Sequence, residues 1–224
     1  MKQGLAEIVF ILDRSGSMHG LEEDTIGGFN NLIHRQKEDG GEALVSTVLF
    51  DDVIEVIHDR VPLESVPELT EKEYFVRGTT ALLDALGGGI RHIGYIHKHA
   101  PDEERPEKTL FVITTDGLEN ASRRYRYAEI KYKVERQQRR YGWEFLFLGA
   151  NMDAISEAAA IGIRANRAVR YLRDRDGTVL NYDVMHDAIR HVRFSSSRLP
   201  NDWKRRIEED MDRRGGDVDD TFRK

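Results

Sequence analysis

Four short, nearly unbroken apolar segments constrain the fold of this chain more than any other feature of its sequence. They lie at residues 5–12, 43–50, 108–114 and 143–149. Segments of this length that are apolar at almost every position are typical of strands covered on both faces, as in the centre of a parallel sheet. Each segment stops at polar or glycine-containing sequence, which indicates that a loop follows each strand.

Segments with a helical spacing of apolar residues alternate with these strands. Helices are predicted at residues 21–37, 81–99, 127–141, 153–161 and 179–192, and a short strand at 168–172. Residues 53–61 alternate between apolar and polar side chains, which predicts an antiparallel edge strand. This order predicts an α/β domain with a doubly wound, mainly parallel central sheet, one antiparallel edge strand and helices on both faces, as in Rossmann-like folds.

The length of 224 residues fits one such domain with a short appendage. The alternation of strands and helices ends near residue 194. The sequence beyond it is rich in charged side chains, and only residues 204–211 suggest a short helix. We therefore expect one domain at residues 1–194 and a charged, mobile tail at residues 195–224.

The composition excludes several classes of site. The sequence contains no cysteine, which excludes disulfides, thiol nucleophiles and cysteine-ligated zinc, and fits a reducing compartment. The net charge of −6 makes nucleic acid an unfavourable partner for the chain as a whole. No export signal is evident at the N-terminus, and no segment approaches the roughly 20 apolar residues of a membrane span. A cytoplasmic protein without membrane association is expected.

Three predicted loops place oxygen-bearing side chains at the carboxyl ends of strands or at the start of a helix. Asp13, Ser15 and Ser17 follow the first strand, Thr80 precedes a helix, and Asp116 follows the strand at 108–114. Ligands of open α/β sheets bind at this edge of the sheet. Carboxylate and hydroxyl oxygens are ligands for Mg²⁺, Mn²⁺ or Ca²⁺ rather than for zinc or copper. The sequence therefore predicts a divalent-cation site.

At these three loops the sequence resembles the von Willebrand factor A family. Residues 13–17 (DRSGS) resemble its D-x-S-x-S element, residues 77–85 (RGTTALLDA) its threonine element, and residues 111–117 (FVITTDG) its strand ending in T-D-G. The resemblance covers residues 5–193 in order and spacing. Counting back from Leu82 and Ala85 favours Thr80 over Thr79 as the matching threonine.

In that family these elements form a metal-ion-dependent adhesion site. The resemblance implies that Ser15, Ser17 and Thr80 coordinate Mg²⁺ (or Mn²⁺) directly, and that Asp13 and Asp116 act directly or through water. It further implies a protein partner whose Asp or Glu completes the coordination shell, and a last helix that shifts in some members. Stand-alone intracellular members serve as adaptors in larger assemblies, so a non-catalytic interaction module is expected.

Several arginines are predicted at the same end of the sheet as the metal. Arg14, Arg77, Arg123 and Arg124 are expected to form a basic rim around the site. Such a rim would attract an acidic segment of a partner toward the cation.

Two other functions stay open at this stage. A Mg²⁺-dependent phosphoester hydrolase would use Asp13 as nucleophile, but Ser15 stands where such enzymes carry an acid–base carboxylate. An RNA-binding adaptor would use the arginine- and tyrosine-rich segment 123–141, although a solvated amphipathic helix explains the same pattern. No phosphate-binding or dinucleotide-binding glycine motif is present, and an enzyme is not expected.

Overall fold

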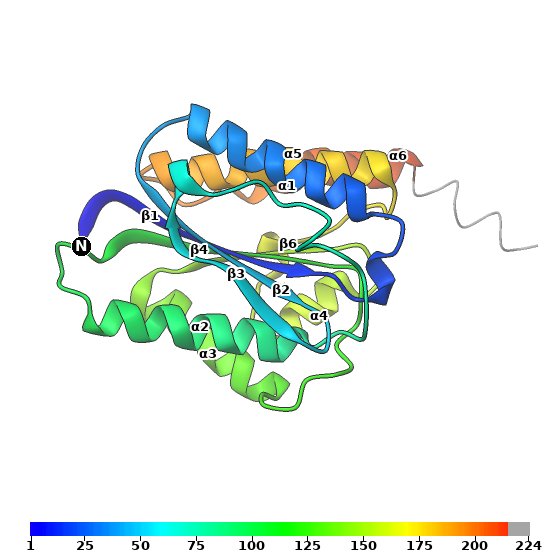
Figure 1. The fold of residues 1–224 in the computed structure, drawn as a ribbon, viewed down its shortest axis with the longest axis horizontal. Coiled ribbons are helices and arrows are strands. Elements are labelled where there is room, and N and C mark those ends of the chain that lie inside the picture. The colour runs from blue at the N-terminus through cyan, green and yellow to red at the C-terminus, as the bar shows by residue number, and fades with distance from the viewer. Residues whose placement is uncertain (215–224) are drawn as a thin grey trace, which may run out of the picture.

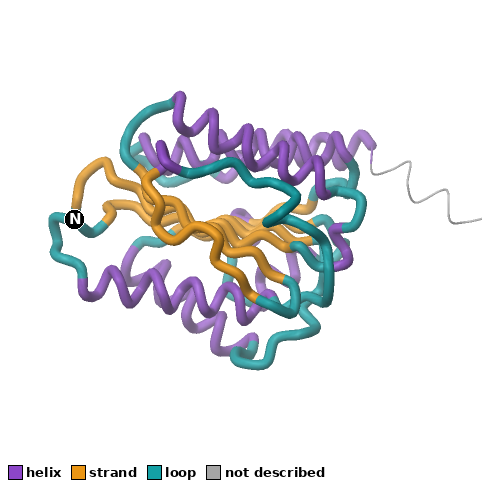
Figure 2. Tube along the Cα trace, viewed as in Figure 1, coloured by secondary structure: helices purple, strands orange, loops and turns teal. Residues whose placement is uncertain are grey.

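The computed structural model describes residues 1–214, and its centre is a six-stranded sheet in the order β3-β2-β1-β4-β5-β6 (Figures 1 and 2). The strands are β1 (Lys2–Asp13), β2 (Ala43–Phe50), β3 (Ile54–Pro62), β4 (Pro106–Thr115), β5 (Glu144–Gly149) and β6 (Ala168–Arg170). Only β3 pairs antiparallel, and it does so at one edge of the sheet. The predicted α/β class, the doubly wound sheet and the antiparallel edge strand are confirmed.

Helices cover both faces of this sheet, as Figure 1 shows. One face carries α1 (Glu22–Glu38), α5 (Arg175–Phe194) and α6 (Arg205–Arg214), and the other carries α2 (Leu82–His99), α3 (Tyr127–Tyr141) and α4 (Ala154–Ala160). Four short 3-10 helices occupy loops: η1 (Gly16–Met18), η2 (Leu63–Ser65), η3 (Ala165–Arg167) and η4 (Asn201–Lys204). None of the helices among the described residues is long and apolar enough to cross a membrane.

The core lies in two layers, because successive side chains of a strand point to opposite faces. In β1, Ile8, Phe10 and Leu12 pack toward α1 and α5, whereas Val9 and Ile11 pack toward α2 and α3. All five are buried. Burial on both faces explains why this strand is apolar at almost every position.

Helices α1 and α5 approach each other closely at one glycine. A Cβ atom on Gly28 of α1 would lie 2.2 Å from the ring of Tyr182 in α5. The missing side chain of Gly28 therefore makes the space in which the buried Tyr182 ring sits.

The strand order places a topological switch point at the carboxyl ends of β1 and β4. These two strands are neighbours, but the chain leaves β1 toward α1 on one face and leaves β4 toward α3 on the other. The loops that follow them diverge, and ligands of open α/β sheets bind at such a point.

The segment after residue 194 differs from the expected mobile tail as far as it is described. Leu199 and Ile207 are buried against the domain, and the Trp203 indole N–H donates to the carbonyl of Asn166 at 2.9 Å. Charged residues separate these apolar residues in the sequence. The sequence pattern therefore predicted a charged tail and did not predict that its apolar side chains pack against the domain. Residues 215–224 of the expected tail lie outside the described residues.

Candidate metal centre

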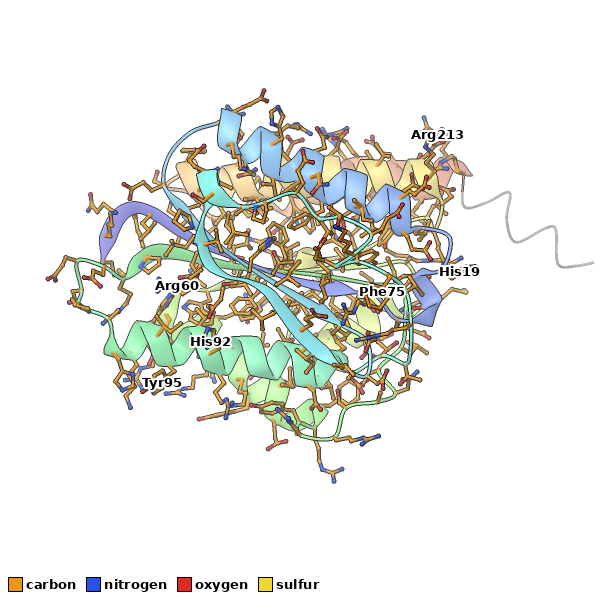
Figure 3. The ribbon with its side chains drawn as sticks, viewed as in Figure 1. His19, Arg60, Phe75, His92, Tyr95 and Arg213 are labelled. Atoms are coloured by element: carbon orange, nitrogen blue, oxygen red, sulfur yellow. The ribbon has the colours of Figure 1, made fainter. Side chains whose placement is uncertain are left out.

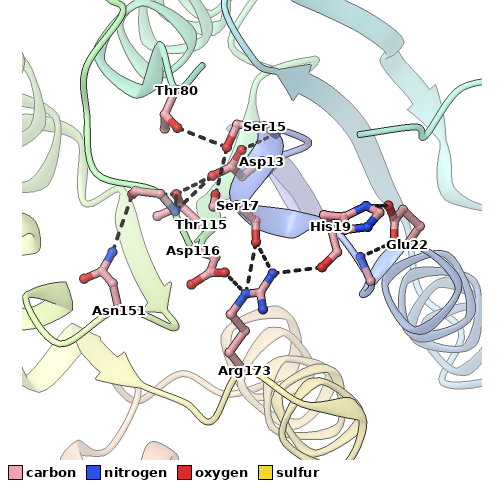
Figure 4. A network of polar contacts seen from close by, with 12 residues as sticks. Asp13, Ser15, Ser17, His19, Glu22, Thr80, Thr115, Asp116, Asn151 and Arg173 are labelled. Carbon is pink, nitrogen blue, oxygen red and sulfur yellow. Dashed lines mark hydrogen bonds and ion pairs between the residues drawn. The ribbon is translucent and has the colours of Figure 1, made fainter. Parts of the chain in front are cut away.

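Asp13 ends β1, and hydrogen bonds fix its carboxylate at this edge of the sheet (Figure 4). Its Oδ1 accepts the backbone N–H of Ser15 at 2.7 Å, and its Oδ2 accepts the Thr115 hydroxyl at 2.6 Å and the Gly117 N–H at 3.4 Å. Burial raises the pKa of Asp13 above its usual value, and the hydrogen bonds from Thr115, Ser15 and Gly117 offset this only in part. An ionised Asp13 is thus a buried negative charge that a nearby cation would stabilise.

Three hydroxyl groups gather beside this carboxylate. Ser15 Oγ lies 2.9 Å from Ser17 Oγ and accepts a hydrogen bond from Thr80 Oγ1 at 3.0 Å. A Cβ atom on Gly117 would lie 2.4 Å from Thr80 Oγ1 and 3.1 Å from Ser17 Oγ. Gly117 therefore leaves open the space into which the hydroxyls point. Thr79, the neighbouring threonine, is exposed.

Hydrogen bonds from backbone and side-chain groups connect the loops that carry these side chains. Gly16 N–H donates to the carbonyl of Gly78 at 3.1 Å, and Thr80 N–H donates to Asn120 Oδ1 at 2.9 Å. The buried Tyr74 hydroxyl donates to the carbonyl of Asp13 at 2.6 Å. These bonds set the positions of the hydroxyls relative to the carboxylate before any ligand arrives.

Asp116 lies at the same edge, where the guanidinium of Arg173 forms an ion pair with it (Figure 4). Arg173 Nε also donates to the carbonyl of Ser17 at 3.0 Å, and Nη2 donates to the carbonyl of His19 at 2.8 Å. Burial raises the pKa of Asp116, the Arg173 charge and hydrogen bond lower it, and the nearby Asp13 charge raises it. The net pKa of Asp116 is above its usual value. All five predicted ligand residues thus lie together at the carboxyl ends of β1 and β4 (Figure 4).

The predicted basic rim is only partly present. Arg14 is fully buried, with Nε 2.9 Å from Asp51 Oδ2 and Nη2 2.9 Å from Glu55 Oε2, so it is not a rim residue. Burial raises the pKa of Asp51, but hydrogen bonds from Arg77 and Val53 and the charge of Arg14 outweigh this and keep that pKa below its usual value. The expectation for Arg14 was wrong because Asp51, which neutralises it, is distant in sequence.

The other three rim arginines lie at the surface. Arg77 is exposed along part of its length, and its Nε lies 2.8 Å from Asp51 Oδ2. Arg123 and Arg124 have exposed side chains, and their backbone N–H groups donate to the Asp84 carboxylate at 2.8 and 2.9 Å. This anchors the loop between β4 and α3 while its arginine side chains remain in solvent.

Two residues of the centre were missed in the sequence. Thr115, which donates to Asp13, is part of the quoted T-D-G element and could have been found by asking which hydroxyl satisfies the buried carboxylate. Arg173 lies in the loop between β6 and α5, 57 residues from Asp116. It carries no local signal among the 34 lysines and arginines of the chain.

The donor set fits a hard divalent cation. Among residues 1–214 no three His, Asp or Glu side chains converge in a way that could hold a metal, so hydroxyl oxygens must supply most of the ligands. Two carboxylates and three hydroxyls suit Mg²⁺ or Mn²⁺, which usually retain water or accept an outside oxygen in the remaining positions.

No protein-family model and no curated protein matches the sequence. Solved structures resemble the fold. A D319A mutant of the PilB minor pilin from Streptococcus sanguinis superposes with a TM-score of 0.61 at 15% identity, over 86% of this chain and 63% of that one. The von Willebrand factor type A from Catenulispora acidiphila gives a TM-score of 0.55 at 17% identity, over 81% and 42% of the two chains.

Proximal thread matrix protein 1 from the mussel byssus, in a structure with a zinc-occupied MIDAS motif, gives a TM-score of 0.55 at 17% identity, over 83% of this chain and 46% of that one. The chain spans less than two thirds of the length of each of these three structures. Structural similarity at such low sequence identity shows a common fold and does not show a common function. The chemistry of the site must therefore be inferred from the residues of this chain. The chain has a von Willebrand factor A-like fold.

Proposed function

We propose that this chain is a non-catalytic interaction module that binds a protein partner through a divalent cation. Ser15, Ser17, Thr80, Asp13 and Asp116 would hold Mg²⁺ or Mn²⁺. The observation that carries the proposal is the convergence of three hydroxyls beside the buried Asp13 carboxylate, in a space that only a glycine at position 117 leaves open.

The small number of charges at the centre determines what the cation would do there. A cation held mainly by neutral hydroxyls retains Lewis acidity and would bind a carboxylate of the partner. The partner is therefore expected to present Asp or Glu. Arg77, Arg123 and Arg124 would increase the rate at which an acidic segment arrives, because long-range attraction acts mainly on association.

The two alternative functions have weaker support. Both oxygens of Asp13 already accept hydrogen bonds from Ser15, Thr115 and Gly117, and the nearby Asp116 is engaged by Arg173, so neither carboxylate is placed as a free acid or base for hydrolysis. The arginine- and tyrosine-rich segment 123–141 is divided between the loop beside the metal centre and the length of α3, and the net charge of −6 opposes RNA binding by the chain as a whole.

Metal binding is tested by thermal unfolding in EDTA and then with increasing Mg²⁺ or Mn²⁺. A ligand that binds only the folded state at about 100 times its Kd stabilises by about 2.7 kcal/mol, which raises the Tm of a domain this size by several degrees. The rise should be absent in Asp13→Ala. No rise in the wild-type protein at millimolar metal would refute a site that binds metal without its partner.

Carboxylate recognition is tested separately, by selecting random displayed peptides on the immobilised protein in Mg²⁺. The selected peptides should be enriched in Asp or Glu and should dissociate in EDTA. Peptides without acidic residues, or peptides that stay bound in EDTA, would contradict the proposed mode of binding.

A further inference from the structure

A concave site lies at the other end of the domain from the candidate metal centre. It is a cavity of about 750 Å³ between the second half of α2, the second half of α3 and the first residues of β4. Figure 3 shows Tyr95, which lines this cavity, and His19, which lies beside the metal centre, at opposite ends of the domain. Since β4 begins here and ends at the metal centre, the two sites are separated by the length of the sheet.

The charge around this cavity is opposite in sign to that of the chain. The whole sequence has 40 acidic and 34 basic residues, yet six basic side chains and one acidic side chain line the cavity. The basic residues are Arg91, Lys98, Arg105, Lys133, Arg136 and Arg140, and the acidic residue is Glu107. Arg105 pairs with Asp102 at 3.0 Å. Within the described part of the chain, the other five form no ion pair with a carboxylate.

Helix electrostatics explain only some of these charges. Basic residues in the last turn of a helix are favoured by its dipole, which accounts for Lys98 and Arg140. Arg91, Lys133 and Arg136 lie before the last turns of their helices. Like charges on two helices that face one cavity repel each other, and an anion between them would relieve this repulsion.

Flat aromatic rings and an amide also line the cavity. Tyr95 and Tyr141 have exposed fractions of 65% and 51%, and the Trp143 indole stacks on Phe111 at 5.4 Å between centroids. Gln137, a buried residue of the cavity wall, has a side-chain oxygen that is removed from solvent and has no hydrogen-bond partner among the described residues. Buried polar atoms of this kind usually have a hydrogen-bond partner.

We propose that this cavity binds a nucleotide. The cations would contact its phosphates by charge-assisted hydrogen bonds, and an exposed tyrosine ring would stack on its base. The Gln137 amide, once turned toward the cavity, would hydrogen-bond to a base or ribose group. The volume lies within the roughly 300–1,000 Å³ of small-molecule sites. This proposal does not depend on the metal centre.

The test follows the fluorescence of Trp143 in a Trp203→Phe variant, which leaves Trp143 as the only indole in the chain. ADP and inorganic pyrophosphate are titrated in EDTA at low salt, and calorimetry on the wild-type protein gives the same comparison if the variant does not fold. ADP should bind more tightly than pyrophosphate, and its affinity should fall as salt is added. Equal affinities would overturn the assignment of a nucleotide, because the ring would then contribute nothing.

Charge reversal provides a matched control. Arg136→Glu should weaken ADP binding by about tenfold or more, as expected when a charge-assisted hydrogen bond to phosphate is lost. Arg139→Glu makes the same change of charge at an exposed position of α3 outside the cavity, and should have little effect. The proposal is overturned if the two variants weaken binding equally, if ADP does not bind at millimolar concentration, or if a single-stranded RNA oligomer binds and ADP does not.

Discussion

Replacement of Arg173 by alanine should increase the affinity of the chain for Mg²⁺ or Mn²⁺. The Arg173 guanidinium lies against Asp116, one of the proposed metal ligands, so a cation that binds Asp116 would compete with this ion pair. The Arg173 side chain is 43% exposed and that of Asp116 is 8% exposed. A partly exposed pair of this kind contributes about 1 kcal/mol or less. Removing the competing contact therefore predicts an affinity gain of up to about fivefold.

The assay is a titration of EDTA-treated protein with Mn²⁺, in which electron paramagnetic resonance measures the free ion. Arg175→Ala is the matched control, because Arg175 is two residues away, its side chain is 82% exposed, and its Nε lies 3.7 Å from Asp24 Oδ1. That variant should bind as the wild-type protein does. If the affinity of Arg173→Ala for Mn²⁺ is unchanged or weaker than that of the wild-type protein, and its Tm in EDTA is unchanged, Arg173 does not compete with the metal. A weaker affinity would further indicate that Arg173 holds Asp116 in the orientation the metal needs.

Three further changes test other parts of the structure. Gly117→Ala should abolish Mn²⁺ binding, because its Cβ would lie 2.4 Å from Thr80 Oγ1; the titration above measures it. Ile207→Ala should cost about 2–4 kcal/mol in the free energy of unfolding, measured in urea, because this α6 side chain is buried. Burial lowers the pKa of His186 below 6.5, so protonation favours the unfolded chain. The free energy of unfolding should therefore decrease as the pH falls below about 6.5, and this decrease should be smaller in His186→Gln than in the wild-type protein. Urea unfolding midpoints at pH 7.5 and pH 5.5 measure both.

Each of these has an outcome that contradicts it. Normal Mn²⁺ binding by Gly117→Ala would mean that the metal does not enter the space beside Thr80. A loss below about 0.5 kcal/mol in Ile207→Ala would place α6 outside the cooperative unit. An equal acid sensitivity of His186→Gln and wild type would show that His186 does not govern the change, and the buried His58, whose pKa burial also lowers, would be the next residue to replace.

The strands and the ligand-bearing loops were predictable because their signals are local. A buried parallel strand is apolar at nearly every position, so β1, β2, β4 and β5 stand out in the sequence, and the polar residues that end β1 and β4 meet because parallel neighbours end at one edge. The misjudged features depend on contacts between residues far apart in the chain. Arg14 is buried because Asp51 neutralises it, and Arg173 reaches Asp116 only through the fold.

The same limit applies to the segment after residue 194. This segment has few apolar residues, and charged residues surround Leu199, Trp203 and Ile207. Neither the spacing of its apolar residues nor its mean hydropathy therefore reveals that these side chains pack against the domain. The packing depends on groups of the domain that receive them, including the carbonyl of Asn166 for the Trp203 indole. Sequence patterns report what a segment could bury, and partners elsewhere in the chain decide whether it does.

The contact between Tyr182 and Gly28 fixes the axial register of α5 against α1. An α-helix rises about 1.5 Å per residue, so sliding α5 by even one residue would carry the tyrosine ring from the glycine onto a neighbouring side chain. The neighbouring Gly27 cannot accept the tyrosine ring in place of Gly28. A Cβ atom added to Gly27 would meet nothing within 4 Å, and this residue is exposed. Any shift of α5 along the sheet is therefore expected to carry α1 with it, and with α1 the 3-10 turn that bears Ser17.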